Sequence, residues 1–337
     1  MERLVIYDTD QFDCSGLYAL GNDPDAIVIG ERPHPLTAET ADETATIAAI
    51  FVTSRVDRRV LVRMPHLKLL ICLSTGTNHV DLKECTARGI TVCNVPDYGA
   101  QTVAEYTLGL MLALARRIPE TSQLLKKGQA AHAQLIGRDL AGQTLTVVGT
   151  GRIGANVIRF ARALGMRVLG VDVRPQPQLA AELGFEYVGL HDALAAADVV
   201  SLHAPLTPDN RHLLNRRSLG LLKSDALIIN TARGELIDTT ALLHALHTGK
   251  LGGAALDVIE DEHLLTGSVE MHIQENGHVK TEVKREIAEH EALLALPNVI
   301  LTGHNAFNTH QAHVRLASGG VEAVRAFQSG RPIRVVS

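Results

Sequence analysis

The sequence predicts an α/β protein with two doubly wound parallel-sheet domains and a cleft between them. Short apolar runs alternate with polar, helix-like segments along most of the chain, and strands that alternate with helices indicate a parallel sheet covered on both faces. A glycine-rich turn near the middle of the chain opens a second strand–helix series. The length of 337 residues is also typical of two domains.

The first hundred residues contain five predicted strands, at 4–7, 26–30, 48–52, 67–72 and 90–95. An apolar helix is then predicted from about Thr102 to Ile118, and Pro119 marks either a break or the start of a new helix. Apolar residues occur on nearly all sides of this helix, which is typical of a helix buried on two faces.

The second series begins at Thr144. Its apolar runs are 144–149, 166–172, 185–189, 198–203, 226–230, 254–259 and 298–303. We expect this series to supply a complete six-stranded doubly wound sheet, so the final helix, 311–328, should return to the first domain. The predicted domains are therefore 1–101 with 304–337, and 102–303.

Residues 260–296 form a highly charged excursion. This segment is much longer than the usual strand connection of about 2–6 residues, so we expect a lid or a surface excursion beside the cleft. Its histidines lack metal-ligand spacing and are expected on a solvated surface because charge runs are usually exposed; they are His263, His272, His278 and His290. No metal site is predicted.

Composition argues against several classes of partner. Only 3% of the residues are aromatic and the net charge is −5, so a nucleic-acid footprint is missing. The longest apolar run, within 106–118, is too short for a membrane span, which needs roughly 20 residues. The start, MERLVIYD, enters a strand and does not resemble a signal peptide. The irregularly spaced Cys14, Cys72, Cys85 and Cys93 predict reduced, buried thiols and a soluble, cytoplasmic protein.

The stretch TLTVVGTGRIG carries a dinucleotide-binding fingerprint, Gly149-x-Gly151-x-x-Gly154. It follows a predicted strand and opens a helix, which is the context that the motif requires. The first glycine allows the tight turn, the second lets the backbone approach a pyrophosphate, and the third lets helix and strand pack closely. Arg152 and Ile153 fall in the first helical turn, where free N–H groups favour an anion.

A second strand of this unit ends in Asp172, 18 residues beyond Gly154. A carboxylate at this point accepts hydrogen bonds from ribose hydroxyls and repels a 2′-phosphate. The sequence therefore favours NAD over NADP, although the nearby Arg174 could soften that preference.

The stretch IINTARGELID, 228–238, places Arg233 after a buried strand. An arginine in such a place is costly unless an anion meets it. The sequence thus predicts an anionic ligand, or a protein carboxylate, opposite this side chain.

Together these motifs resemble the D-isomer-specific 2-hydroxyacid dehydrogenases over essentially the whole chain. The resemblance is carried by STGTNHVDL (74–82), NVPDYGAQTVAEYTLGLMLALAR (94–116), VVGTGRIG (147–154), SLHAPLT (201–207), INTARGELID (229–238), AALDVIEDE (254–262) and LPNVILTGHNAFNT (296–309). The later segments are most similar to the D-lactate dehydrogenase branch, and 74–82 and 90–98 also resemble hydroxypyruvate reductases. The resemblance implies a Rossmann NAD domain and a flavodoxin-like substrate domain.

It also implies a triad of Arg233, Glu262 and His304. Reduction of a 2-keto acid needs a cation that grips the substrate carboxylate, and arginine does so with two parallel N–H bonds. It needs a proton donor that works near neutral pH, for which histidine is suited. A carboxylate must orient the imidazolium, and Glu260 competes with Glu262 for that role.

Further site residues follow from the same resemblance. The implied cofactor residues, besides the fingerprint and Asp172, are His203, Pro205, Thr231, Ala232, Arg233 and Asp257; the implied substrate residues are Thr75, Gly76, Tyr98 and Arg233. A packed tyrosine is nearly as good an interpretation of Tyr98. The segment 102–137 is expected to be the arm of a homodimer.

Two positions depart from the family pattern. Gly303 stands where the family usually has a proline before the catalytic histidine, and Thr53 stands where lactate enzymes have a tyrosine. The resulting prediction is an NAD-dependent oxidoreductase that interconverts a small 2-keto acid and its D-2-hydroxy acid, of the D-lactate/pyruvate type. The alternatives are a hydroxypyruvate or glyoxylate reductase, and an NAD-sensing scaffold like the C-terminal-binding-protein corepressors.

Overall fold

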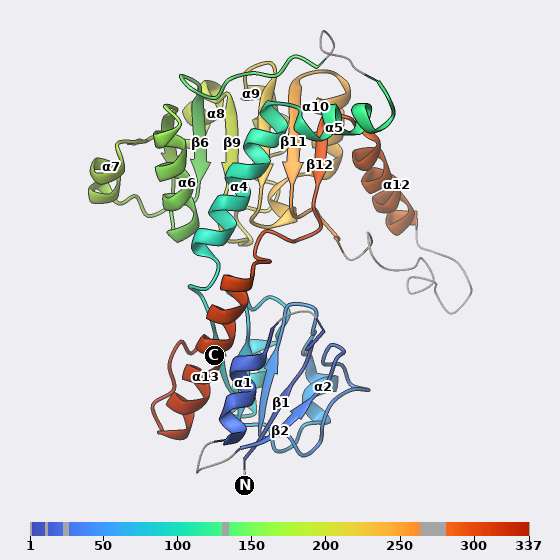
Figure 1. Ribbon diagram of the computed structural model, residues 1–337, viewed down its shortest axis with the longest axis vertical. Helices are drawn as coiled ribbons and strands as arrows, with labels where there is room; N and C mark the ends of the chain where they lie inside the picture. The colour runs from blue at the N-terminus through green and yellow to red at the C-terminus, as the bar shows by residue number, and fades with distance from the viewer. Residues whose placement is uncertain are drawn as a thin grey trace. The chain divides into compact units, whose positions relative to one another are not determined.

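The computed structural model divides the chain into two compact units (Figure 1). Unit 1 comprises Met1–Gly99 and Asn308–Ser337, and unit 2 comprises Ala100–Phe307. The expected ranges met at 101 and 304, a few residues from these boundaries. The structure describes residues 2–10, 13–22, 27–129, 135–262, 264 and 281–336.

Unit 1 contains a five-stranded, entirely parallel sheet in the order β2-β1-β3-β4-β5. Its strands are β1 (Arg3–Ile6), β2 (Val28–Glu31), β3 (Ile47–Ile50), β4 (Leu69–Cys72) and β5 (Thr91–Asn94). Every residue of β3 and β4 is buried, which explains why the central strands read as unbroken apolar runs.

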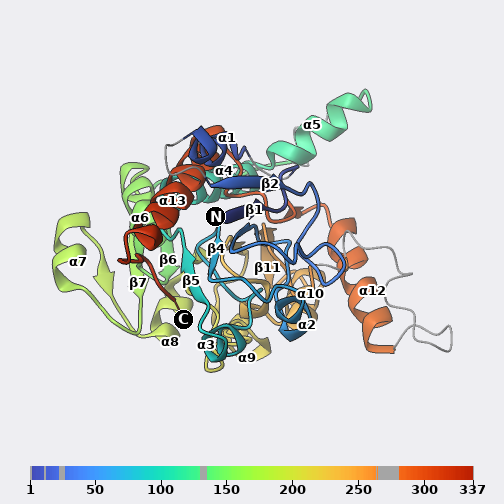
Figure 2. The same ribbon diagram turned by 90° about the horizontal axis from the view of Figure 1, so that it is seen from below.

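Helices lie on both sides of this sheet. Figure 2 shows α1 and α13 on one side of the strands and α2 and α3 on the other. The bounds are α1 (Ser15–Tyr18), η1 (Ala19–Asn22), α2 (Arg58–Val62), α3 (Leu82–Ala87) and α13 (His310–Gln328). The final helix begins at the N-cap Thr309 and packs against α1, where Gly16 brings it close to Ala317.

Unit 2 contains a seven-stranded, entirely parallel sheet in the order β12-β11-β10-β9-β6-β7-β8. Its strands are β6 (Thr144–Val148), β7 (Arg167–Val171), β8 (Glu186–Tyr187), β9 (Val199–Leu202), β10 (Ala226–Asn230), β11 (Leu251–Leu256) and β12 (Val299–Leu301). The predicted doubly wound parallel sheets are confirmed, but the expected strand count of six is wrong. Each of the seven apolar runs contributes a strand, including the two-residue edge strand β8.

Two apolar layers hold unit 2 together. Helices α4 and α6 pack on one face of the sheet, and α8, α9 and α10 pack on the other. Along β10, Leu227 and Ile229 belong to the first layer while Ala226 and Ile228 belong to the second, as the two-residue period of a strand requires. The helices are α4 (Ala100–Ala115), α5 (Ile118–Lys126), α6 (Arg152–Ala163), α7 (Pro177–Leu183), α8 (Leu190–Ala196), α9 (Arg216–Leu221), η2 (Gly234–Leu236), α10 (Thr239–His247) and α12 (Thr281–Ala295).

The helix predicted over 102–118 is divided into two. Helix α4 ends at Ala115, and Arg117, in the left-handed region with φ 52°, precedes a new helix that has Pro119 in its first turn. The interpretation of Pro119 as the start of a fresh helix is confirmed. Helix α5 buries none of its residues, and Figure 2 shows it extending away from the sheet of unit 2.

Part of the charged excursion lies within the described residues. Helix α12 packs beside β12 and α10, and its inward face carries Leu293 and His290, which is 3% exposed. The expectation of a solvated His290 is therefore wrong: the charge run is a helix with one buried face. The other three histidines, His263, His272 and His278, lie outside the described residues.

All four cysteines are free and buried, as the sequence predicts. Burial raises the pKa of the Cys72 thiol to about 12 and that of the Cys85 thiol to about 11, so these thiols stay protonated at neutral pH. None of the helices in the described part of the chain is long and apolar enough to cross a bilayer.

Candidate active site

Most of the predicted site residues of unit 2 follow the carboxyl ends of neighbouring strands. The glycine turn follows β6, His203 follows β9, Arg233 follows β10, Asp257 follows β11 and His304 follows β12. The chain order reverses between β6 and β9, and open α/β sheets bind their ligands at such a switch point. One edge of the sheet thus gathers both the predicted nucleotide site and the predicted triad.

The glycine turn has the shape that the fingerprint predicts. Gly149 has φ +90°, and a Cβ there would lie 2.6 Å from the backbone N of Ala204; a Cβ on Gly154 would lie 2.0 Å from the carbonyl O of Gly149. A Cβ on Gly151 would meet no atom within 4 Å. Gly151 is also the N-cap of α6 and offers no side chain to its first turn. The turn thus leaves room beside the start of α6, where the first N–H groups of a helix favour an anion such as a dinucleotide pyrophosphate.

Asp172 is held directly after β7. Its Oδ2 accepts hydrogen bonds from the N–H and the Oγ1 of Thr150, at 2.7 and 3.0 Å, and its Oδ1 accepts one from the N–H of Arg174 at 2.9 Å. Burial alone would raise the pKa of Asp172, but these bonds outweigh it and hold the pKa below its usual value. The carboxylate is thus charged at neutral pH, as a ribose ligand that repels a 2′-phosphate must be.

The sequence motifs did not single out Thr150, which bonds to Asp172, or Tyr187. Thr150 occupies a variable position of the fingerprint, and its Oγ1 also lies 2.8 Å from the hydroxyl of Tyr187 on β8. No local pattern marks Tyr187, because its contact with the turn depends on the pairing of β8 with β7.

His203 is the predicted cofactor residue after β9. Its backbone N–H donates to the carbonyl of Val148, and its Nε2 lies 2.8 Å from the Oγ of Ser201. Its Nδ1 is buried and meets no partner among the described residues. Burial lowers the pKa of His203 to about 3, so the ring is neutral at physiological pH. Pro205, two residues on, accepts a hydrogen bond at its carbonyl from Asn210.

The turn that carries Arg233 is organised by Asn230. Asn230 is fully buried, accepts from the N–H of Ala232 and donates to the carbonyl of Arg233. The Oγ1 of Thr231 lies 2.9 Å from that of Thr107 on α4. Arg233 itself is half-buried, and its Nη1 donates to the carbonyl of Ala232 at 2.6 Å. Within the described part of the chain, no carboxylate lies at ion-pair distance from Arg233.

Glu262 and His304 form a direct pair. Oε1 of Glu262 lies 2.8 Å from Nδ1 of His304, and the two side chains are 43% and 35% exposed. With Nδ1 engaged, Nε2 is the ring nitrogen left to face a ligand. Gly303 and His304 both lie in the left-handed region, at φ 61° and 57°. Proline cannot adopt this φ, so the backbone at position 303 is incompatible with the proline that the family usually has there.

Asp257 supports the His304 segment from β11. Its Oδ1 accepts from Thr302 Oγ1 and Asn305 N, its Oδ2 accepts from Ala306 N, and its carbonyl accepts from His304 N. Both carboxylate oxygens of this predicted cofactor residue are thus occupied within the protein. Thr302, which the sequence motifs did not single out, takes part in this support.

Gly234 joins the arginine turn to the glutamate segment. A Cβ at this position would lie 2.0 Å from the carbonyl C of Ile259 and 2.4 Å from the N of Glu260. The backbone just before Glu262 therefore passes directly over the residue that follows Arg233. Any side chain at position 234 would push the two segments apart.

The predicted substrate residues of unit 1 follow β4 and β5. Asn94 donates to the carbonyl of Thr75, whose own Oγ1 donates to the carbonyl of Pro96. These bonds hold Thr75 and Gly76 in a short, accessible loop. Tyr98 is only 9% exposed and its carbonyl accepts from Arg315 on α13, which favours the alternative interpretation of a packed tyrosine.

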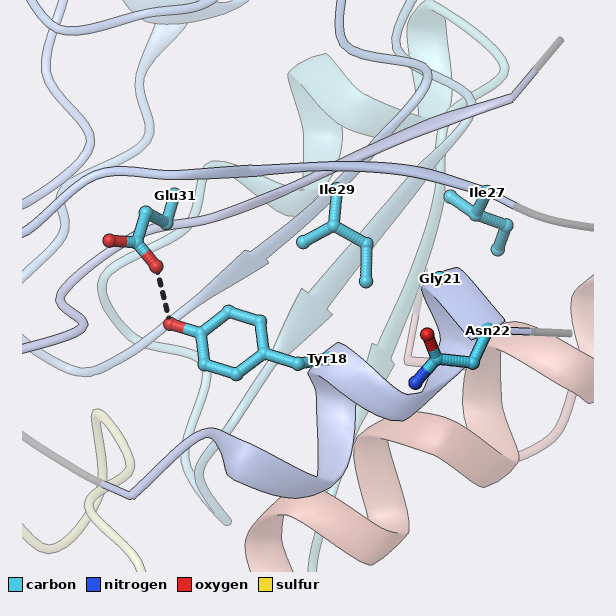
Figure 3. Close-up of a pocket in the computed structure, with 6 residues that line it drawn as sticks. All are labelled: Tyr18, Gly21, Asn22, Ile27, Ile29 and Glu31. Atoms are coloured by element: carbon cyan, nitrogen blue, oxygen red, sulfur yellow. Dashed lines mark hydrogen bonds between the residues drawn. The ribbon is translucent and has the colours of Figure 1, made fainter.

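Unit 1 also has a separate pocket of about 450 Å³, between α1 and β2 (Figure 3). Tyr18 donates to Glu31 across it, at 2.7 Å. It contains none of the predicted site residues. Among the described residues, no group of three or more His, Cys, Asp and Glu side chains could hold a metal ion.

Comparison with known proteins agrees with this arrangement. The family model described as D-isomer specific 2-hydroxyacid dehydrogenase, NAD binding domain, matches residues 108–306. D-lactate dehydrogenase of Escherichia coli is 34% identical to the chain over 97% of both proteins. Glyoxylate reductase of Korarchaeum cryptofilum is 35% identical over 83% of this chain and 78% of its own.

A solved structure, D-lactate dehydrogenase from Aquifex aeolicus complexed with NAD and lactic acid, has a TM-score of 0.82 at 31% identity. It covers 97% of this chain and 96% of its own. The glycine turn, Asp172 and the matched domain point to the same cofactor. The chain therefore belongs to the NAD-dependent, D-isomer-specific 2-hydroxyacid dehydrogenases, and it is similar to their D-lactate dehydrogenase branch.

Proposed function

We propose that the protein reduces a small 2-keto acid of the pyruvate type to its D-2-hydroxy acid, and catalyses the reverse reaction. The observation that supports this best is the Glu262–His304 pair. Arg233, in the turn after the neighbouring strand β10, has no carboxylate partner among the described residues. A cation, an imidazole and its orienting carboxylate are the groups that this reaction needs.

In this proposal Arg233 binds the substrate carboxylate with its planar fork and polarises the keto oxygen. His304 donates a proton from Nε2 to the developing alkoxide, while Glu262 holds the ring through Nδ1 and stabilises its protonated form. The hydride would come from NADH when the cofactor is bound. Asp257 holds the His304 segment next to the end of β11. Gly234 lets the segment before Glu262 pack against the turn that carries Arg233.

The glycine turn, with Gly149, Gly151 and Gly154, and the start of α6 at Arg152 and Ile153 would hold the pyrophosphate, and Asp172 would bind the adenosine ribose. For His203, Pro205, Thr231 and Ala232 we propose contacts to the nicotinamide half, since they follow strands β9 and β10 at the same sheet edge. For Thr75, Gly76 and Tyr98 we propose substrate contacts, which the family resemblance supports.

The substrate can be identified with a panel of keto acids. NADH oxidation should be measured with pyruvate, hydroxypyruvate, glyoxylate and longer 2-keto acids at equal concentrations. We expect the highest kcat/KM for pyruvate. A preference for glyoxylate or hydroxypyruvate would favour the second candidate, which is supported by the similarity to a glyoxylate reductase and by Thr53. No turnover with any 2-keto acid would contradict both.

We also propose that the chain forms a homodimer through α4, α5 and the segment up to 137. Helix α5 buries none of its residues and exposes Ile118 and Leu125, and Ile136 is exposed beyond it. A helix that buries none of its residues and exposes apolar side chains is typical of an interface. Light scattering at micromolar concentration should give twice the chain mass of 36.3 kDa; a single-chain mass would contradict the proposal.

The four unpaired cysteines favour a cytoplasmic location.

A further inference from the structure

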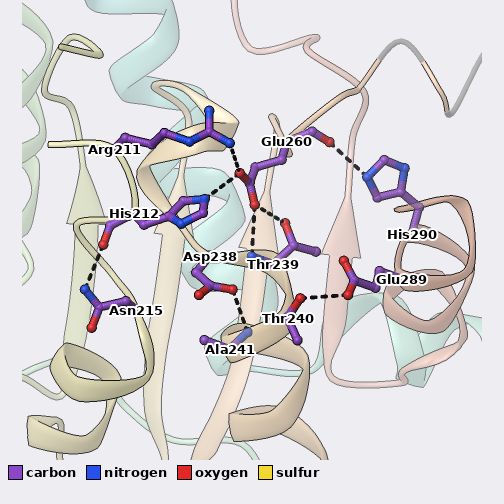
Figure 4. Close-up of polar contacts among 10 residues, drawn as sticks. All are labelled: Arg211, His212, Asn215, Asp238, Thr239, Thr240, Ala241, Glu260, Glu289 and His290. Atoms are coloured by element: carbon purple, nitrogen blue, oxygen red, sulfur yellow. Dashed lines mark hydrogen bonds and ion pairs between the residues drawn. The ribbon is translucent and has the colours of Figure 1, made fainter. Parts of the chain in front are cut away.

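The carboxylate of Glu260 collects four hydrogen bonds from two other segments (Figure 4). Its Oε1 lies 3.0 Å from Nη2 of Arg211 and 2.6 Å from Nε2 of His212, both in the loop before α9. Its Oε2 accepts from the N–H and the Oγ1 of Thr239, at 3.1 and 3.0 Å, at the start of α10. The side chain is 14% exposed. Four donors saturate the acceptor sites of this carboxylate.

The backbone of Glu260 is held as well. Its carbonyl accepts from Nε2 of the buried His290 on α12, at 2.9 Å, and its N lies against Gly234. The two preceding residues, Val258 and Ile259, are 4% and 6% exposed. The segment from Asp257 to Glu260 is thus fixed at both ends, by Asp257 to the His304 segment and by Glu260 to three neighbouring elements.

Only Asp261 separates this anchor from Glu262. Asp261 has φ 49°, a region that non-glycine residues rarely adopt unless their surroundings impose it. A displacement of Glu260 would therefore be passed directly to the carboxylate that pairs with His304.

We propose that Glu260 is a positioning residue that sets the Glu262–His304 distance. This inference rests on the proposed roles of Glu262 and His304. The charged and titratable groups that face Glu260 are Arg211 and His212 from the loop before α9 and His290 from α12; Asp238 instead caps α10, and Glu289 accepts from Thr240.

The test is the titration of the His304 ring, followed by NMR in the full chain without substrate and assigned by loss of its signal in His304→Gln. Glu262→Gln removes the carboxylate partner, so the titration midpoint should move to lower pH. Glu260→Gln cannot accept all four hydrogen bonds, so we expect a smaller movement in the same direction. The double variant should behave like Glu262→Gln alone, because Glu260 acts only through Glu262.

The matched control is Glu289→Gln, which removes a carboxylate from α12 that accepts a single hydrogen bond from Thr240 and should leave the titration unchanged. A midpoint in Glu260→Gln equal to that of the unchanged protein would overturn the proposal, even if the variant were less stable. So would additive shifts in the double variant. If Glu260→Gln does not fold, His212→Gln, which replaces one of the four donors, takes its place with the same expected direction.

Turnover provides a second measurement. In Glu260→Gln, kcat for keto-acid reduction should fall on the order of tenfold, the scale of a small misplacement of a catalytic group, with little change in KM for NADH. An absence of turnover in the unchanged protein would contradict the proposed function. It would leave the test of Glu260 intact, because the NMR titration needs no substrate.

Discussion

Oε1 of Glu262 lies 2.8 Å from Nδ1 of His304, whereas Glu260, two residues earlier, points its carboxylate at Arg211, His212 and Thr239. The sequence offers two carboxylates as partners for the imidazole, and the structure brings Glu262 to it. Two residues of similar chemistry thus have different surroundings, which makes their substitutions informative.

The pair predicts a change in the pH dependence of keto-acid reduction. In the proposed mechanism the reaction needs a protonated His304, so keto-acid reduction should become slower as pH rises and the ring loses its proton. Glu262→Gln removes the anion that lies 2.8 Å from the ring, so this limb should move to lower pH. The measurement is kcat/KM against pH with saturating NADH. A limb that moves in Glu260→Gln but stays in place in Glu262→Gln would show that Glu262 is the wrong partner.

Arg233→Lys tests the anion that faces Arg233. Lysine keeps the charge but loses the planar fork, so we expect a loss of about 2–4 kcal/mol of transition-state stabilisation. The loss should appear both in KM for the keto acid and in kcat, with NADH affinity and melting temperature preserved. A destabilised but fully active variant would instead indicate that the arginine serves a protein carboxylate.

Asp172→Ala tests the choice between NAD and NADP. The variant should bind NADH more weakly and narrow the NADH/NADPH preference, because it loses both the ribose hydrogen bonds and the repulsion of a 2′-phosphate. Fluorescence titration with each cofactor measures both effects. An unchanged preference ratio would exclude Asp172 as the ribose ligand.

His203 predicts a loss of stability in mild acid. Its pKa is about 3 in the folded protein against 6.5 for an ordinary histidine, so the unfolded chain binds the proton more tightly. The contribution of a neutral His203 is complete above about pH 6.5 and is lost as pH falls toward 3, by about 1 kcal/mol per pH unit. Urea unfolding at pH 7, 6 and 5 should show a shallower decline for His203→Gln than for the unchanged protein. Parallel declines would contradict the prediction.

Gly234→Ala should disturb both halves of the proposed triad. The new Cβ would lie 2.0 Å from the backbone of Ile259, and such overpacking costs about 1–3 kcal/mol or more. Gly220→Ala in α9 is the matched control, since its Cβ would meet nothing within 4 Å; it should be neutral or stabilising by about 0.5–1 kcal/mol. Thermal unfolding and kcat should be measured on both variants. Equal effects of Gly234→Ala and Gly220→Ala would contradict the interpretation.

The sequence predicts most of the fold because each strand is a continuous apolar run between polar helices. It predicts β3 and β4, whose residues are all buried. It also locates the turn at Gly149, from three glycines between a predicted strand and a predicted helix. The predicted number of strands in the second sheet is wrong because the two-residue β8 pairs only at the sheet edge. Whether so short a run joins a sheet depends on the space beside β7, which no local pattern records.

The site is less predictable than the fold. The roles of Arg233 and His304 are predicted from the family resemblance and the chemistry of their side chains. The partners of Glu260 come from the loop before α9, from α10 and from α12, which are far apart in sequence. His290 illustrates the same limit: a histidine in a charge run is expected in solvent, yet the helix that contains it turns this residue inward. Tertiary contacts of this kind decide which of several similar side chains is available for chemistry.

The left-handed backbone of His304 should lower the stability of the fold at the same position that is proposed to donate the proton. A φ of 57° is adopted more easily by asparagine or glycine than by histidine, so His304→Asn should relieve strain while removing the proposed proton donor. Screens of variant libraries that reward heat resistance alone would then enrich robust proteins that have lost turnover. Selection for thermal stability should therefore leave residue 304 unchanged and vary other positions, for instance exposed glycines in helices.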